Sequence, residues 1–145
     1  MKGSDWEEVS EALDRWILDI EGIEEGAAIL VEGKKDTYSL RSLGIGGDIR
    51  EMNVGLPILD LLEHMKRGTG PFEERPRIKK LIILVDWDRK GDRLASMLEQ
   101  YCRSVELECD LEFRRRLSMI TRRWIVDVES IDSIYRNLKQ GKLKP

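Results

Sequence analysis

Two short apolar runs, each ending abruptly in charged residues and a glycine, dominate the hydrophobic pattern of this chain. The first covers residues 27–31 and leads into Glu32-Gly33, and the second covers residues 81–85 and leads into an acidic segment at 86–88. Short runs that contain β-branched residues and are bounded by charge are typical of strands buried on both faces of a parallel sheet. The pattern therefore predicts two buried parallel strands with acidic side chains at their carboxyl ends.

Between and around these runs, apolar residues recur mostly at helical spacing. Further strands are expected near 49–53, 105–109 and 124–128, while 68–76 is rich in Gly and Pro and predicts a loop without regular structure. Helices are expected up to residue 20, at 36–43, 57–65 and 92–102, between Arg116 and Arg122, and at 130–138. This alternation predicts an α/β fold of Rossmann-like type, with a mostly parallel sheet of about four strands flanked by helices.

The chain of 145 residues has the length of one domain. We expect residues 1–24 to form an amphipathic helix packed on the domain, residues 25–140 to form the α/β domain itself, and residues 141–145 to be a frayed tail.

Charge and cysteine usage narrow the functional classes. The net charge of −3 argues against bulk electrostatic binding of nucleic acid, although a local basic face remains open. Cys102 and Cys109 stand seven residues apart with His64 as the single histidine, which fits two reduced thiols better than a zinc site. No apolar run approaches the roughly 20 residues of a membrane span, and the first residues lack a secretory pattern, so a soluble cytoplasmic protein is expected.

Three carboxylates form the candidate site. Ligand chemistry in open α/β sheets gathers at the carboxyl ends of strands, so Glu32, Asp86 and Asp88 should share one crevice. Without a cation such a group repels itself, and its oxygen ligands suit Mg²⁺ or Mn²⁺. The sequence therefore predicts a divalent metal site, with Mg²⁺ as the first expectation.

The segments Glu32-Gly33-Lys34-Lys35-Asp36 and Asp86-Trp87-Asp88-Arg89-Lys90-Gly91 resemble the two signature motifs of the Toprim domain, shared by topoisomerases, bacterial-type primases, some nucleases and recombination proteins. The resemblance covers about residues 25–140. Within the family the chain is most similar to the Toprim region of the ribonuclease that matures 5S ribosomal RNA precursors, through residues 31–37 and Val128-Glu129. The glycine pattern usual before the latter element is replaced here by Arg122-Arg123-Trp124.

The resemblance implies catalytic and metal-binding roles for three residues. Asp86 and Asp88 would hold the metal, while Glu32 would join them or act as general acid/base. Asp36 is expected to cap the following helix rather than touch metal. The remaining candidates lie beside these acids: Lys34, Lys35, Arg89 and Lys90 as phosphate contacts, and Gly33 and Gly91 in support.

These expectations lead to a Mg²⁺-dependent nuclease that acts on structured RNA rather than DNA. The alternative is a non-catalytic metal-binding accessory that docks on nucleic acid or on a larger nucleic-acid enzyme. Topoisomerases need a tyrosine on a separate domain, whereas Tyr38, Tyr101 and Tyr135 are expected to be core or edge residues of helices. Bacterial-type primases need additional modules.

The three arginines at 114–116 are expected to form either a solvated helix face or a contact surface for nucleic acid.

Two other acid-bearing folds fit less well. A response-regulator-like phosphoacceptor needs a Thr or Ser and a Lys at the ends of later strands, and the late strand ends near Asp110 and Asp127 carry neither. Haloacid-dehalogenase-type phosphatases place their Asp-x-Asp near the N-terminus, unlike residues 86–88.

Overall fold

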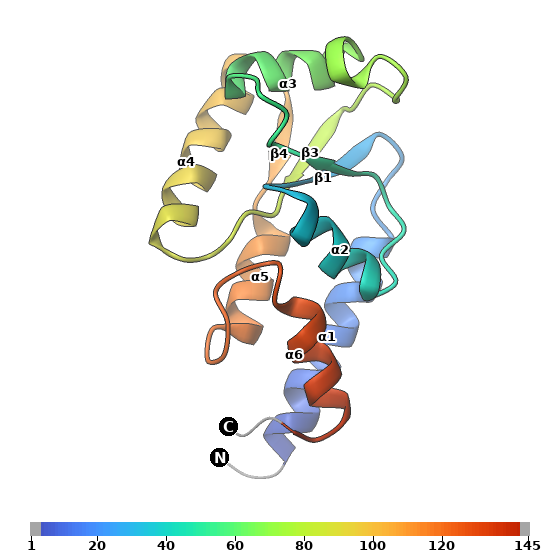
Figure 1. Ribbon diagram of the computed structural model, residues 1–145, viewed down its shortest axis with the longest axis vertical. Coiled ribbons are helices and arrows are strands. Elements are labelled where there is room, and N and C mark those ends of the chain that lie inside the picture. The colour runs from blue at the N-terminus through green and yellow to red at the C-terminus, as the bar shows by residue number, and fades with distance from the viewer. Residues whose placement is uncertain (1–3, 143–145) are drawn as a thin grey trace.

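Four parallel strands form the sheet of this protein, in the order β2-β1-β3-β4 (Figure 1). The structure is a computed structural model that describes residues 4–142. The strands are β1 (Ala27–Val31), β2 (Ile49–Glu51), β3 (Lys80–Ile83) and β4 (Glu108–Asp110). The two strands predicted from the strongest apolar runs are the central pair, and the predicted α/β class with a parallel sheet is confirmed.

Helices cover both faces of the sheet (Figure 1). They are α1 (Ser4–Glu21), α2 (Lys34–Ser42), α3 (Ile58–Arg67), α4 (Arg89–Ser104), α5 (Glu112–Thr121) and α6 (Ile131–Lys139), with a short 3₁₀ turn, η1 (Gly70–Phe72), in the loop before β3. Side chains of a strand alternate between faces. Ile29 of β1 accordingly packs with α1, α2, α5 and α6, and its neighbour Leu30 packs with α3 and α4.

The helix α1 packs mainly against α5 and α6 (Figure 1). Trp16 is fully buried there, and its Nε1 donates a hydrogen bond to the carbonyl oxygen of Phe113 at 2.8 Å. The two rings also meet edge to face, with centroids 6.1 Å apart. No helix within residues 4–142 has the length and apolar character needed to cross a bilayer.

The expected strand at 124–128 is wrong, because this segment is irregular. It still runs beside the end of β3, where the backbone N–H of Trp87 donates to the carbonyl oxygen of Val126 at 2.8 Å. Val128 is fully buried in the core. The apolar character that suggested a strand therefore reflects packing of a loop.

Two further boundaries differ from the sequence pattern. Alternation at 105–109 predicted one strand, but Glu106 has a φ of 57°, in the left-handed region, and β4 begins only at Glu108. The loop expected at 68–76 contains the 3₁₀ turn that buries Phe72. In both places a local turn interrupts a segment for which the polarity pattern predicted a single state, a strand at 105–109 and an irregular loop at 68–76.

Candidate functional site

Asp86 is the centre of the candidate site, just beyond the end of β3. Its side chain is half-buried, and its Oδ1 accepts a hydrogen bond from the backbone N–H of Val128 at 2.9 Å. Burial raises the pKa of Asp86 to about 6, and the negative charges of Glu32, Asp36 and Asp127 add to the rise. The Val128 N–H lowers this pKa and offsets part of the effect. Excess negative charge therefore accumulates around this carboxyl group.

Asp36 lies in the first turn of α2 and is almost completely buried. The backbone N–H of Gly33 donates to its Oδ2 at 3.1 Å, which confirms the expected capping role. Burial raises the pKa of Asp36, as do the charges of Glu32 and Glu129, although the Gly33 N–H opposes them. Asp36 is thus both a helix cap and a member of the acidic cluster.

Asp88 has a different environment from the other two predicted ligands. It is exposed and is the N-cap of α4, where its Oδ1 accepts a hydrogen bond from the Gly91 N–H at 2.7 Å. This cap makes α4 begin at Arg89, three residues before the expected start at Asp92. In the described part of the chain, no three His, Cys, Asp or Glu side chains are grouped so that they could hold a metal ion.

The acids that do interact form what we call the acidic cluster: Glu32, Asp36, Asp86, Asp127 and Glu129. The sequence motifs supplied the first three members. Asp127 comes from the irregular segment that was expected to be a strand, and Glu129 follows directly after it; only the motif-like Val128-Glu129 pair pointed there. The hydrogen bond from Val128 to Asp86 joins residues 42 positions apart, so local sequence spacing could not predict it.

Gly91 is required by the close approach of α4 to the end of β3. A Cβ atom at this position would lie 1.9 Å from the carbonyl oxygen of Asp86 and 2.5 Å from its carbonyl carbon. The spacing of Asp86, Asp88 and Gly91 therefore has a physical basis. Asp88 caps α4, and the absence of a side chain at Gly91 lets the first turn of α4 pack against the Asp86 backbone. Gly33 is less constrained, since a Cβ there would meet only the Asn53 side chain, at 3.3 Å.

Arg114 on α5 fixes the backbone of the same strand end. Its Nε donates to the carbonyl oxygen of Val85 at 3.0 Å, and its Nη2 donates to that of Asp86 at 2.6 Å. The same Nη2 forms an ion pair with Asp92 at 2.7 Å. Arg114 therefore positions the site, which neither interpretation of the arginine run anticipated.

The other two arginines of that run also have partners within the chain. Arg115 pairs with Glu112, one helical turn away, and Arg116 pairs with Asp19 of α1 at 2.8 Å. Arg114 and Arg116 therefore tie α5 to neighbouring elements, whereas the Arg115 pair stays within α5. The arginines were visible in the sequence, but their partners on α1, on α4 and in the segment after β3 were not.

The four predicted phosphate contacts are all exposed and flank the acids in sequence. Lys34 and Lys35 begin α2, and Arg89 and Lys90 begin α4. Within residues 4–142, none of the four forms an ion pair, in contrast to the arginines of α5. Their side chains are free to meet an anion near the first turns of two helices, where the helix dipole also favours negative charge.

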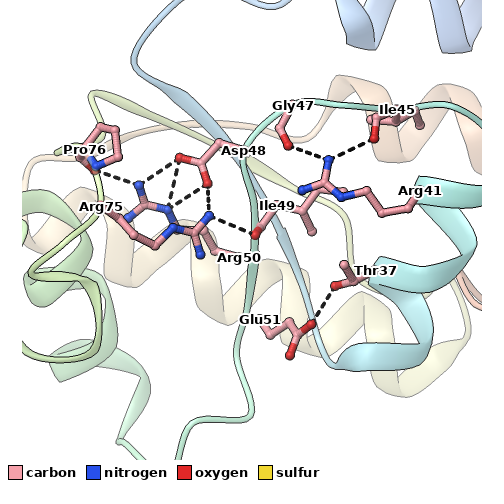
Figure 2. A network of polar contacts seen from close by, with 10 residues as sticks. All are labelled: Thr37, Arg41, Ile45, Gly47, Asp48, Ile49, Arg50, Glu51, Arg75 and Pro76. Carbon is pink, nitrogen blue, oxygen red and sulfur yellow. Dashed lines mark hydrogen bonds and ion pairs between the residues drawn. The ribbon is translucent and has the colours of Figure 1, made fainter.

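The neighbouring edge strand β2 contributes a further acid, Glu51, paired in register with Val31 of β1. Its Oε2 accepts a hydrogen bond from Thr37 Oγ1 at 2.8 Å, so α2 is tied to the sheet edge (Figure 2). Figure 2 also shows Asp48 between the guanidinium groups of Arg50 and Arg75. Arg50 is fully buried and also donates to the carbonyl oxygen of Pro76 at 2.6 Å.

Several archaeal proteins are similar to this chain over most of their length. A UPF0292 protein of Methanosarcina acetivorans is 34% identical over 134 residues, which is 89% of this chain and 83% of the relative. Those of Methanosarcina barkeri and Pyrococcus horikoshii are 37% and 35% identical, over 79% and 74% of this chain and 73% and 74% of the relatives.

A solved structure supports the same fold. A putative protein from Aquifex aeolicus superimposes with a TM-score of 0.63 at 26% identity, covering 82% of this chain and 97% of that protein. No protein-family model matches the chain. On the extent and level of its similarity to the archaeal relatives, the chain belongs to the UPF0292 protein family.

Proposed function

We propose that this protein is a Mg²⁺-dependent, Toprim-type nucleic-acid-processing protein that hydrolyses a phosphodiester bond in structured RNA. The observation that carries the proposal is the half-buried Asp86, whose pKa is raised to about 6 by burial and by Glu32, Asp36 and Asp127. A cation would offset this repulsion, and perturbed carboxyl groups at strand ends are typical of functional sites. The resemblance of residues 32–36 and 86–91 to the Toprim motifs supports the same conclusion.

The donor atoms fit Mg²⁺ by their chemistry. This ion needs only one or two carboxylates and fills its other positions with water and phosphate oxygens, so a closed cage of three acids is not required. Glu32 and Asp86 would hold it, and Asp88 could join through its Oδ2 while its Oδ1 still accepts the Gly91 N–H. A bound Mg²⁺ would neutralise charge on the phosphate oxygens and activate a water molecule.

The chain's own residues would orient the substrate. Arg114 and the Val128 N–H keep Asp86 in place from two directions. Lys34, Lys35, Arg89 and Lys90 are free to contact phosphates on either side of the acidic cluster. By the Toprim resemblance, Glu32 would either hold the metal with Asp86 or act as general acid/base. The cytoplasmic location expected from the sequence is part of this proposal, since an RNA substrate would be met there.

Cleavage of a mixed panel tests the proposal. Structured RNAs, single-stranded DNA and nicked or supercoiled DNA are incubated with the wild type in Mg²⁺, Mn²⁺ or EDTA. We expect metal-dependent cleavage of RNA that Asp86→Asn abolishes and that Asp60→Asn, an exposed acid on α3, leaves unchanged. Cleavage that persists in EDTA, or in Asp86→Asn, would contradict the proposed site.

The second candidate function is a metal-binding accessory without catalysis. It is favoured by the small size of the chain and by its net charge of −3. Calorimetric Mg²⁺ binding together with a salt-sensitive nucleic-acid complex, but no product on any substrate, would identify this function. Such a protein would act by docking on nucleic acid or on a larger nucleic-acid enzyme.

A further inference from the structure

Tyr38 is an exposed aromatic residue next to the acidic cluster, although the sequence suggested a core or edge position. It lies on α2, and 71% of its surface is exposed. Within residues 4–142 its hydroxyl group forms no hydrogen bond and its ring meets no cation or second ring. The preceding residue, Thr37, anchors the helix to Glu51 of β2, which holds this part of α2 in a fixed position (Figure 2).

Tyr38 lines a surface hollow of about 430 Å³ together with Lys34, Lys35, Glu129 and Asp132. Asp132 is already engaged, because its Oδ1 accepts a hydrogen bond from Ser39 Oγ at 3.2 Å, which ties α6 to α2. The hollow is therefore framed by two helices that are joined to each other. Its positive charges are the two unpaired lysines on the α2 side.

The hollow adjoins the acidic cluster through one shared residue. Glu129 belongs to both, since it lines the hollow and its charge contributes to the raised pKa of Asp36. Lys34 and Lys35 are separated from Glu32 only by Gly33. A chain of phosphates that passes the acids would therefore meet the lysines and the tyrosine ring next.

We propose that Tyr38 is a stacking platform for one unpaired base, and that Lys34 and Lys35 contact the phosphates adjoining that nucleotide. A tyrosine ring stacks on any base, and lysines neutralise backbone phosphates, which together are the usual means of holding a single strand. A continuous duplex offers no free base face. The inference rests on the proposed function and narrows its substrate class to RNA with an unpaired nucleotide beside the phosphate held at the acids.

The test measures binding of a fluorescently labelled single-stranded RNA by anisotropy in EDTA, which prevents metal-dependent cleavage. Tyr38→Ala should weaken binding about 5- to 150-fold with an unchanged salt dependence, while Tyr38→Phe should retain it. Lys34→Ala should instead lower the salt slope, by roughly 0.7 for each lost phosphate contact. Leu18→Ala, which removes a side chain 65% exposed on α1, should behave as the wild type.

A second readout reports the stacking itself. RNA with 2-aminopurine at one unpaired position should lose emission on binding to the wild type and to Tyr38→Phe, but not to Tyr38→Ala. Equal affinity of wild type and Tyr38→Ala would overturn the platform and leave the proposed function standing. A Tyr38→Phe variant as weak as Tyr38→Ala would also overturn it, because a hydroxyl contact would then replace stacking. No binding of the single-stranded RNA by the wild type in EDTA would overturn the platform, while the cleavage panel decides the proposed function separately.

Discussion

Burial and neighbouring acids disfavour a negative charge on Asp86, so the stability of the fold depends on pH. Its pKa is about 6 in the folded protein against an ordinary 3.8. Because the folded state binds the proton more tightly than the unfolded state, stability is lost as the pH rises between these two values. The raised pKa of Asp36 adds to the loss in the same direction.

We therefore expect Asp86→Asn to raise the Tm at pH 7.5 without metal. An asparagine Oδ1 can still accept the Val128 N–H, while the unfavourable charge disappears. The gain should vanish near pH 4, where the wild-type carboxyl group is protonated. Differential scanning calorimetry at the two pH values measures both effects, with Asp60→Asn as the control. A lower Tm for Asp86→Asn at pH 7.5 would show that the carboxylate stabilises the fold.

Gly91 gives a second prediction at the scale of single residues. Gly91→Ala places a methyl group 1.9 Å from the Asp86 carbonyl oxygen, so the strand end or the helix must move. We expect a loss of about 1–3 kcal/mol in the free energy of unfolding in urea. Gly46→Ala is the matched control, because a Cβ there has no atom within 4 Å. A Gly91→Ala variant as stable as Gly46→Ala would contradict the tight packing of α4 on β3.

Among the elements, the edge strand β2 depends on one buried cation. Arg50 has no exposed surface, and its charge is balanced by Asp48, which also binds Arg75 of the loop before β3 (Figure 2). The Nη1 of Arg50 has no hydrogen-bond partner among the described residues. The guanidinium group also lies over the Phe72 ring, 5.2 Å from its centroid.

Asp48→Asn should consequently cost about 3–5 kcal/mol of unfolding free energy, since it leaves a buried cation without its counter-charge. Urea denaturation provides the measurement. Glu63→Gln, which breaks a surface pair with Arg67 at 2.9 Å, should change stability by less than about 1 kcal/mol. Equal losses in the two variants would indicate that Arg50 reaches water in the folded protein.

The elements themselves were predictable to different degrees. The run at 27–31 matched β1 because a buried parallel strand has a strong local signature. The start of α4 was placed three residues late because the apolar pattern of this helix begins only at Leu94, while its capped first turn, Arg89-Lys90-Gly91, is polar. The segment 124–128 was misassigned because burial of a loop produces the same polarity pattern as a short strand.

Across the whole molecule, the site residues that lie within the two sequence motifs could be predicted. The contacts between segments far apart in the chain could not. Glu32, Asp36 and Asp86 follow from two motifs at strand ends. Arg114 and Val128, which hold Asp86, lie 28 and 42 residues away from it in the chain. Their contacts exist only once α5 and the segment before α6 have packed on the sheet, and no periodicity encodes such pairings.

The same contacts determine when the site can exist during synthesis. Chains are made from the N-terminus, so both acidic motifs leave the ribosome before the segment around Val128 does. Until that segment arrives, Asp86 lacks the backbone N–H that orients its carboxylate. A nascent chain therefore carries Glu32, Asp86 and Asp88 before the site is complete, and the acidic cluster forms only after residues 127–129 have left the ribosome.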